Sequence, residues 1–248
     1  MRRFLGGGTT FLDRNQIFYQ CIFHHSRVPW RADKVYKMML DAPVKVLNRI
    51  GLSGRLRAVN EVEANSLRIA GIGGGRVGEA MVVVGNLLLD FDYRLMSSVW
   101  KVSDQSFRNL ALETMEERVG TLNKLGCDHT LESLESHLAE AFIESLERPL
   151  RDQQLKSEEI QAGRNAASDL SSLEFLSLHN PVGKVKPMKS LKISADVFIH
   201  RIHIRLEDQV ADVSVRADKG IVTDLQTDSP KKTKIRKFLI GTPLSEWT

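Results

Sequence analysis

One glycine-rich stretch, Leu67 to Asn86, constrains what this chain can fold into. Apolar runs at 67–70 and 81–84 flank its glycines, and runs rich in β-branched residues predict strands. Glycines between strands let the backbone turn and approach a ligand closely. We therefore predict a glycine loop between two strands, whose free N–H groups form a cradle for a phosphate or carboxylate. The glycines are Gly71, Gly73, Gly74, Gly75, Gly78 and Gly85.

The spacing of Gly73, Gly75 and Gly78 also fits G-x-G-x-x-G, a dinucleotide-binding fingerprint that would indicate an oxidoreductase. That fingerprint needs a helix after its third glycine. Three consecutive valines at 82–84 favour a strand instead. Asp90 and Asp92 are candidates for the acidic residue that follows this fingerprint further along the chain, but they add little support because acidic residues are common. We favour a glycine turn between paired strands, and failure to bind any dinucleotide would exclude the alternative.

Composition indicates a folded chain with length for one large domain or two smaller ones, since 42% of its 248 residues are hydrophobic and 27% charged. A net charge of +4 permits an acidic partner without requiring nucleic acid. No apolar run approaches the ~18 residues that span a membrane, and the start lacks a signal-peptide core. Cys21 and Cys127 give neither a disulfide framework nor a zinc spacing. We expect a cytoplasmic protein without membrane or nucleic-acid partners.

The elements ahead of the glycine stretch are a strand over 17–23, a helix over 34–47 and a strand over 55–64. Asp33 is a candidate cap for the helix, and Pro43 is the position where it would break. His24 and His25 at the end of the first strand are a weak indication of a metal site, and structural imidazoles are the favoured interpretation.

Two helices are expected after the glycine stretch, one capped by Ser103 or Asp104 and running to about Lys124, the other capped by Thr130 and ended by Pro149. Residues 151–165 are polar and predict a linker or solvated helix. Alternating apolar residues over 190–227 predict an antiparallel meander with turns at 208–209 and 219–220. A final helix runs from Ser229 and Pro230 toward Ile240.

The first residues pair two arginines, Arg2 and Arg3, with three glycines, Gly6, Gly7 and Gly8. Such a segment is either a frayed basic terminus or a working loop, in which glycines admit a ligand and an arginine holds an anionic group. Four segments in order resemble motifs of the lipoate–protein ligase family, which has the biotin/lipoate ligase fold. They are R-R-x-x-G-G-G-x-x-x-x-D at 2–13, an N-D-like pair at Asn60-Glu61, a K-[IV]-x-G-like segment at 68–71 and a G-T-L-L-L-like segment at 85–89.

The resemblance covers nearly the whole chain and implies its architecture. It implies an α+β fold, in which a mixed β-sheet packed by helices is followed by a small C-terminal antiparallel β-rich accessory domain. Residues 1–150 would form the ligase-like catalytic domain without its usual N-terminal elements, residues 151–175 a linker or helix, and residues 176–248 the accessory domain.

The resemblance also implies a two-step reaction. ATP with Mg²⁺ activates lipoate or octanoate to the acyl-adenylate, and the acyl group passes to a lysine of a lipoyl domain, of the kind in E2 subunits or H protein. Arg68 would be the catalytic residue. The residues implied to bind substrate or nucleotide are Arg2, Arg3, Gly6, Gly7, Gly8, Asp13, Asn60, Gly71 and Gly85.

The sequence departs from the family pattern at the position of its essential lysine, where it has Arg68. Arginine keeps the charge but spreads its donors over a larger fork, so the exchange is not conservative at a tight site. The pair at 60–61 ends in Glu61 in place of aspartate, and Met1 directly precedes the arginine pair, where members have further residues. The alternative to a ligase is therefore a non-catalytic relative that binds an acyl group, a nucleotide or a lipoyl domain. Neither cysteine lies in the loop ahead of Arg68, which argues against the cysteine-dependent transferases of this fold.

Overall fold

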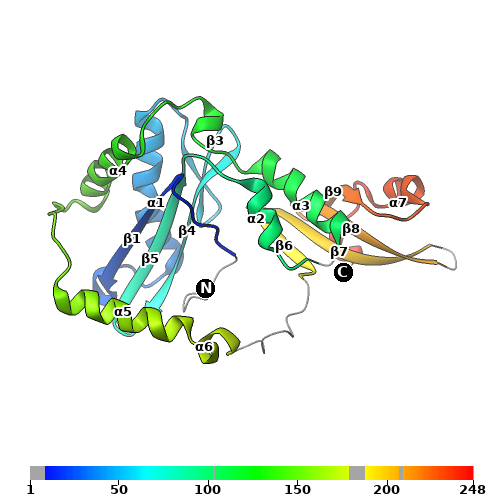
Figure 1. The fold of residues 1–248 in the computed structure, drawn as a ribbon. Coiled ribbons are helices and arrows are strands. Elements are labelled where there is room, and N and C mark those ends of the chain that lie inside the picture. The colour runs from blue at the N-terminus through cyan, green and yellow to red at the C-terminus, as the bar shows by residue number, and fades with distance from the viewer. Residues whose placement is uncertain (1–8, 103, 179–187, 207–208, 248) are drawn as a thin grey trace.

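The computed structural model describes residues 9–102, 104–178, 188–206 and 209–247 as an α+β fold with two β-sheets (Figure 1). The predictions for Arg2, Arg3, Gly6, Gly7 and Gly8 lie outside the described residues. None of the helices in the described ranges has the length and apolar character that crossing a membrane requires.

The first sheet has five strands in the order β1-β5-β4-β3-β2. A mixed sheet was expected, but every pair of these strands is antiparallel, and the parallel contact is an isolated bridge between Arg68 and Val119. The chain can build this sheet from hairpins because its strands follow each other closely. The strands are β1 (Gln16–His24), β2 (Arg55–Arg57), β3 (Glu61–Ala64), β4 (Leu67–Val77) and β5 (Ala80–Leu88).

The predicted glycine turn between paired strands is confirmed at Gly78, but the loop is much shorter than predicted, because most of the glycines lie inside strand β4. β4 runs for 11 residues and pairs with β5 through Gly71, Gly73, Gly74 and Gly75. The turn comes later, at Gly78, whose φ of 57° suits glycine. The three valines of β5, at 82–84, pair with Gly75, Gly74 and Gly73, so the ladder continues through the glycines. The strand after Gly78 agrees with the rejection of the dinucleotide fingerprint.

Helices α1 (Ala32–Arg49) and α4 (Leu131–Leu146) cover one face of this sheet (Figure 1). Pro43 lies inside α1 without ending it, contrary to the expected break. An interior proline costs about 3 kcal/mol, and burial of Pro43 with its neighbours Met39 and Val46 offsets that cost. Thr130 caps α4 as predicted, accepting a hydrogen bond from the Ser133 N–H.

The single strand predicted over 55–64 is instead a hairpin of β2 and β3. Arg57 pairs with Glu61, and the chain turns between them with Ala58 at a φ of 51°. The hairpin buries Glu61, Val62 and Glu63, which a single extended segment would not bring together.

The second sheet is the predicted meander, in the order β6-β7-β8-β9. Its strands are β6 (Ser190–Ser194), β7 (Val197–Leu206), β8 (Gln209–Asp218) and β9 (Ile221–Gln226), followed by α7 (Lys232–Leu239). Lys219 and Gly220 form the β8–β9 turn with positive φ, as expected. Asp208 of the other predicted turn lies outside the described residues.

Helices α2 (Tyr93–Val99) and α3 (Gln105–Arg118) lie against this second sheet, where Phe107 of α3 shares a core with Ile193 and Ile199 (Figure 1). Asp104 caps α3 as predicted, through the N–H of Phe107. The helix ends at Arg118 and not at Lys124, because the next residue bridges to β4.

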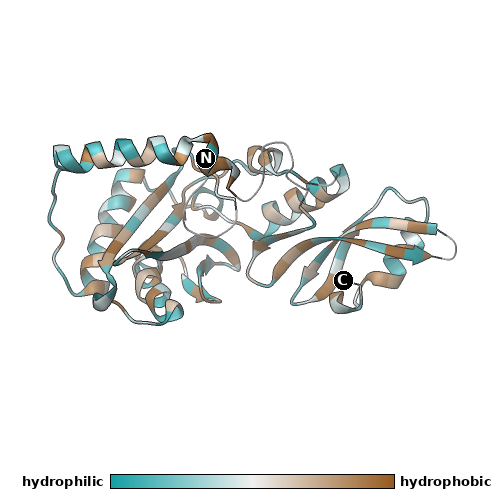
Figure 2. Ribbon diagram, turned by 90° about the horizontal axis from the view of Figure 1, so that it is seen from below, coloured by the Kyte–Doolittle hydropathy of each residue, from teal (hydrophilic) through white to brown (hydrophobic). Residues whose placement is uncertain are grey.

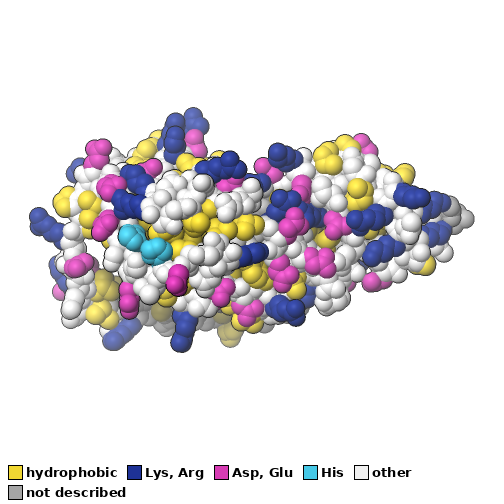
Figure 3. Space-filling view, turned by 90° about the horizontal axis from the view of Figure 1, so that it is seen from above, with side chains coloured by type: hydrophobic (Ala, Val, Ile, Leu, Met, Phe, Trp, Pro, Cys, Tyr) yellow, Lys and Arg dark blue, Asp and Glu magenta, His cyan; other side chains and the backbone are white. Residues whose placement is uncertain are grey.

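Helices α5 (Ser157–Ser171) and α6 (Leu173–Ser177) bury none of their side chains, and α5 is largely hydrophilic in Figure 2. This confirms the solvated-helix interpretation of the polar segment. Basic and acidic side chains are interspersed over much of the face shown in Figure 3, and basic ones predominate toward its right-hand end.

Candidate functional site

A strip without side chains runs along the open face of the first sheet. Tyr19, Cys21 and Phe23 of β1 pack toward α1 and α4, so the alternate residues Phe18 and Ile22 face the other way and are 39% and 62% exposed. Register then places Gly71, Gly73 and Gly75 of β4 on this open face, since they align across β5 with Phe18, Gln20 and Ile22. A Cβ added at Gly73 would meet no atom within 4 Å. The strip therefore offers backbone and open space between apolar side chains.

Arg68 stands at one end of this strip. The β3–β4 pairing shifts by one residue, because Val62 pairs with Ala70 while Glu63 pairs with Arg68. Such a bulge reorients side chains, and here it brings Arg68 and Gly71 together. A Cβ at Gly71 would lie 2.7 Å from Nη2 of Arg68, so the guanidinium occupies the space that this glycine leaves.

The guanidinium of Arg68 is only partly satisfied. Its Nη1 donates a hydrogen bond of 3.2 Å to the backbone carbonyl of Ile193 in β6. Its Nε is buried and has no hydrogen-bond partner among the described residues. A buried N–H without an acceptor is costly in a folded protein, and an anionic or carbonyl oxygen from a ligand would remove that cost.

Asp13, a predicted site residue, connects to Gly71 through two amides. The N–H of Gly71 donates to Oδ1 of Asn86 over 3.0 Å, and Nδ2 of Asn86 donates to Oε1 of Gln16 over 3.3 Å. Nε2 of Gln16 in turn donates to Oδ1 of Asp13 over 3.1 Å. Asp13 thus orients the amides beside the glycine strip. Sequence reasoning missed Gln16 and the amide of Asn86, although Asn86 stands inside a quoted motif.

Two other predicted residues lie elsewhere. Asn60 is in the β2–β3 turn, where its backbone carbonyl accepts a 3.0 Å hydrogen bond from the N–H of Ile72. Gly85 contacts the ring of Tyr19, because a Cβ at Gly85 would lie 2.1 Å from Cζ of Tyr19. That ring packs edge-on against Phe142, with centroids 5.0 Å apart, and its burial raises the pKa of the phenol. Gly85 therefore makes room for the core and does not line the open strip.

Glu61 joins the two sheets, a role that the sequence did not indicate. It is 3% exposed, and its Oε2 accepts a 2.7 Å hydrogen bond from the backbone N–H of Ala195. Its Oε1 lies 3.2 Å from Nζ of Lys192. Arg57 adds a 3.3 Å hydrogen bond to the carbonyl of Ala195. The β6–β7 turn is thereby fixed next to the Arg68 end of the strip.

The described residues offer one group of side chains able to hold a metal ion, His24, His25 and Glu79, at the opposite end of β4 from Arg68. Glu61 is already bonded to Ala195 and Lys192, so the Arg68 end has no free cluster of carboxylates among the described residues. Cys21 faces the core, and burial raises the pKa of its thiol to about 11, which makes it a poor nucleophile.

The relatives found by comparison with known proteins are named as lipoate-protein ligases. Lipoate-protein ligase A subunit 1 of Thermoplasma acidophilum is 24% identical over 173 residues, which are 66% of this chain and 65% of that protein. A probable lipoate-protein ligase A of Mycoplasma pneumoniae is 25% identical over 118 residues, which are 48% of this chain and 34% of that protein. This chain thus spans less than two thirds of the length of these relatives.

Solved structures show the same fold. A bipartite lipoate protein ligase of T. acidophilum, studied with its E2 lipoyl domain, superimposes with a TM-score of 0.65 at 22% identity, covering 75% of this chain and 71% of that one. A second T. acidophilum structure, with bound lipoic acid, gives a TM-score of 0.58 at 20% identity, covering 70% and 69%. A lipoate-protein ligase A bound with ATP gives 0.57 at 21%, covering 70% and 69%.

The family comparison covers the first sheet, its helices and the whole glycine strip. The model of the lipoyl protein ligase A/B catalytic domain matches residues 1–143, which is more than half of the chain. The expected resemblance is confirmed: this chain belongs to the lipoyl protein ligase A/B catalytic-domain family.

Proposed function

We propose that this protein is a lipoate–protein ligase, which uses ATP to activate lipoate or octanoate and transfers the acyl group to a lysine of a lipoyl domain. The observation that supports it best is the arrangement of Arg68 at the end of a bare, apolar-flanked glycine strip, in a chain of this family. Relatives are named as ligases, and neighbours of the same fold have been solved with lipoic acid and with ATP.

The acyl chain would lie along the strip. Gly73 leaves the β4 backbone uncovered there, and Phe18 and Ile22 provide apolar surface beside it. Burying a methylene against such surface contributes about 0.8 kcal/mol, so a medium-length chain would gain useful affinity. The carboxyl end of the chain would then reach Arg68.

Arg68 would bind the oxygen at which charge develops during acyl transfer. Its Nε–H is buried and meets no acceptor in the described part of the chain, and preorganised donors of this kind stabilise a developing anion most effectively in a dry site. The carbonyl of Ile193 and the glycine at 71 hold the guanidinium in place. ATP would supply the adenylyl group that turns the carboxylate into a reactive acyl-adenylate, with pyrophosphate as the leaving group.

The described residues do not build a Mg²⁺ site at this end of the strip, because Glu61 is already bonded to Ala195 and Lys192. We therefore derive no step through Mg²⁺. The remaining nucleotide contacts implied by the family resemblance fall on Arg2, Arg3 and the glycines at 6–8.

The proposal includes the domain roles and the setting. Residues 1–150 would carry the reaction, residues 151–175 would link, and residues 176–248 would serve as the accessory domain, in the cytoplasm. Support for a lipoyl-domain partner comes from the archaeal neighbour, which was studied together with its E2 lipoyl domain. The second candidate is a non-catalytic relative that binds these ligands, favoured by the arginine at position 68.

Intact mass spectrometry of an apo lipoyl domain, incubated with this protein, lipoate, ATP and Mg²⁺, tests the proposal. We expect acylation by the unmutated protein and none by Arg68→Met. Arg205→Lys, a change at an exposed arginine of β7, is the matched control and should keep full activity. Acylation by Arg68→Lys but not by the unmutated protein would establish the binding role instead. Absence of acylation with both lipoate and octanoate in all variants would refute the ligase.

A further inference from the structure

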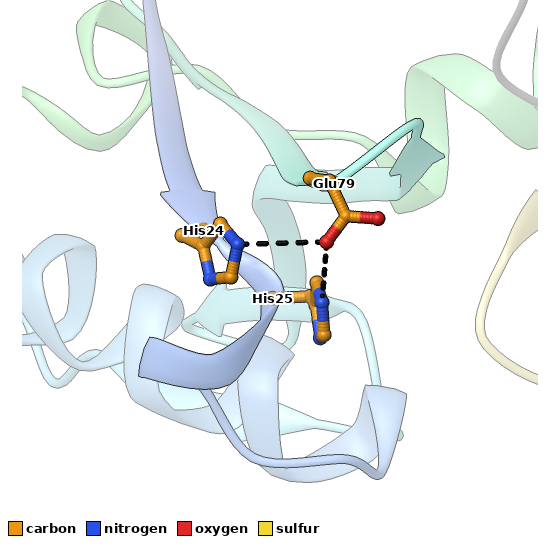
Figure 4. Close-up of side chains that lie close together, drawn as sticks. All are labelled: His24, His25 and Glu79. Carbon is orange, nitrogen blue, oxygen red and sulfur yellow. Dashed lines mark hydrogen bonds and ion pairs between the residues drawn. The ribbon is translucent and has the colours of Figure 1, made fainter.

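Three metal-binding side chains meet at the end of the first sheet that is remote from Arg68 (Figure 4). Nε2 of His25 lies 2.8 Å from Oε2 of Glu79, and Nε2 of His24 lies 3.5 Å from the same oxygen. One donor atom from each residue lies within 4.8 Å of the others. Glu79 closely follows Val77, the last residue of β4. Val77 is nine positions beyond Arg68, so about 30 Å of extended strand separates the two ends.

The backbone fixes this arrangement. Consecutive residues of a strand point to opposite faces, but β1 ends at His24 and the 3₁₀ turn η1 (His25–Arg27) begins at once. This change of conformation directs both imidazoles toward Glu79, as Figure 4 shows, with ring centroids 4.6 Å apart. A 2.9 Å hydrogen bond from the N–H of His25 to the carbonyl of Glu79 ties the two segments together. The three donor side chains therefore come from two segments, the end of β1 with η1 and the β4–β5 turn, which the backbone already holds together.

The donor chemistry suits a transition metal. Two imidazole nitrogens and one carboxylate oxygen form a set used for Zn²⁺, with a fourth position left for water. The side chains of His24, His25 and Glu79 are 55%, 38% and 70% exposed, which leaves room for an ion and its water to enter.

A supporting residue is also in place. Oγ of Ser26 lies 2.7 Å from Nδ1 of His24, the ring nitrogen that faces away from Glu79. Metal-bound histidines almost always donate their second ring N–H to an oxygen, which fixes the ring and strengthens its basicity. In the chain as it stands, Nδ1 of His24 accepts a 3.3 Å hydrogen bond from the backbone N–H of Ser26, so this nitrogen has to become a donor when Nε2 binds a metal, and Oγ of Ser26 is then its acceptor.

We propose that His24, His25 and Glu79 form a binding site for a divalent first-row transition metal of the Zn²⁺ type, which fastens the end of β1 to the β4–β5 turn. The site is independent of acyl transfer, because it lies at the far end of β4 from Arg68. Its effect is structural: an ion bound only by the folded chain raises stability with its concentration.

A titration of the metal-free full chain with Zn²⁺ at neutral pH, followed by calorimetry, tests the site. We expect one equivalent to bind to the unmutated protein, and each of His24→Ala, His25→Ala and Glu79→Gln to weaken binding by at least about tenfold. His203→Ala is the matched control, since His203 is a half-exposed imidazole paired with a single carboxylate, Asp212, and its loss should leave binding unchanged. Circular dichroism of each variant confirms folding.

A thermal melt gives a second measurement. Zn²⁺ should raise the melting temperature of the unmutated protein and of His203→Ala but not of Glu79→Gln. Equal Zn²⁺ affinity in the unmutated protein and in folded His25→Ala and Glu79→Gln would overturn the proposal, as would binding that only His203→Ala abolishes.

Discussion

The buried carboxylate of Glu61 provides a sharp test of how the two sheets are joined. Replacing Glu61 by alanine leaves the N–H of Ala195 buried without its acceptor, which costs about 1–3 kcal/mol. Loss of the pair with Lys192, whose side chain is 42% exposed, adds no more than about 1 kcal/mol. We expect Glu61→Ala to lower the free energy of unfolding by about 1–4 kcal/mol, a substantial single-residue effect.

Glu61→Gln separates the two contributions, because its amide oxygen can still accept from Ala195 while the charge is gone. We expect a loss of about 1 kcal/mol, close to that of an exposed ion pair. Urea unfolding monitored by fluorescence measures both variants, since Trp100 is buried in the core that α3 shares with the second sheet. Glu140→Ala, which breaks an exposed pair with Arg49, serves as the control and should change stability by less than about 0.5 kcal/mol. Equal stability of the alanine variant and the unmutated protein would refute the reasoning.

Three further outcomes are expected. Gly85→Ala should destabilise the fold by about 1–3 kcal/mol, because its methyl group overlaps the Tyr19 ring, and urea unfolding should show a smaller cost in a Tyr19→Ala background. Burial favours a raised pKa for Asp218, but its hydrogen bonds with Arg216 lower the pKa overall. The ionised carboxylate therefore stabilises the fold fully at a pH above the ordinary pKa of 3.8. This contribution disappears as the pH falls through the lower pKa of the folded state. Acid unfolding of Arg216→Leu should accordingly show a weaker dependence on pH in that range. The thiol of Cys21, with a pKa of about 11, should react slowly with a maleimide at neutral pH until the chain is denatured, as mass spectrometry of a Cys127→Ser variant would show.

Elements with a clear period could be predicted from the sequence. The strand at 17–23, the helix after Thr130 and the C-terminal meander all carry regular apolar spacing, and the structure contains each of them. The apolar spacing of a segment does not show which other segment it will pair with. The glycines at 71–75 look like a loop in isolation, and they form a strand because the valines of β5 pair with them.

The site was predictable as a set of motifs and not as an arrangement. Arg68 and Gly71 could be named together, but the bulge that brings them into contact depends on how β3 pairs with β4. Glu61 could not be identified as a link between sheets, since Ala195 lies 134 positions further along the chain. Gly85 is a further example. A glycine is required at this position because the Tyr19 ring of β1 fills the space that a side chain would occupy.

Helix α3 precedes the second sheet by many residues and yet completes its core. A polypeptide cut within residues 151–178, where no side chain is buried, would leave α3 with its apolar side uncovered on one fragment and the matching face of the sheet uncovered on the other. Exposed apolar faces of this kind associate in water. Two separately synthesised fragments would therefore recombine through α3, and neither would be a self-sufficient folding unit.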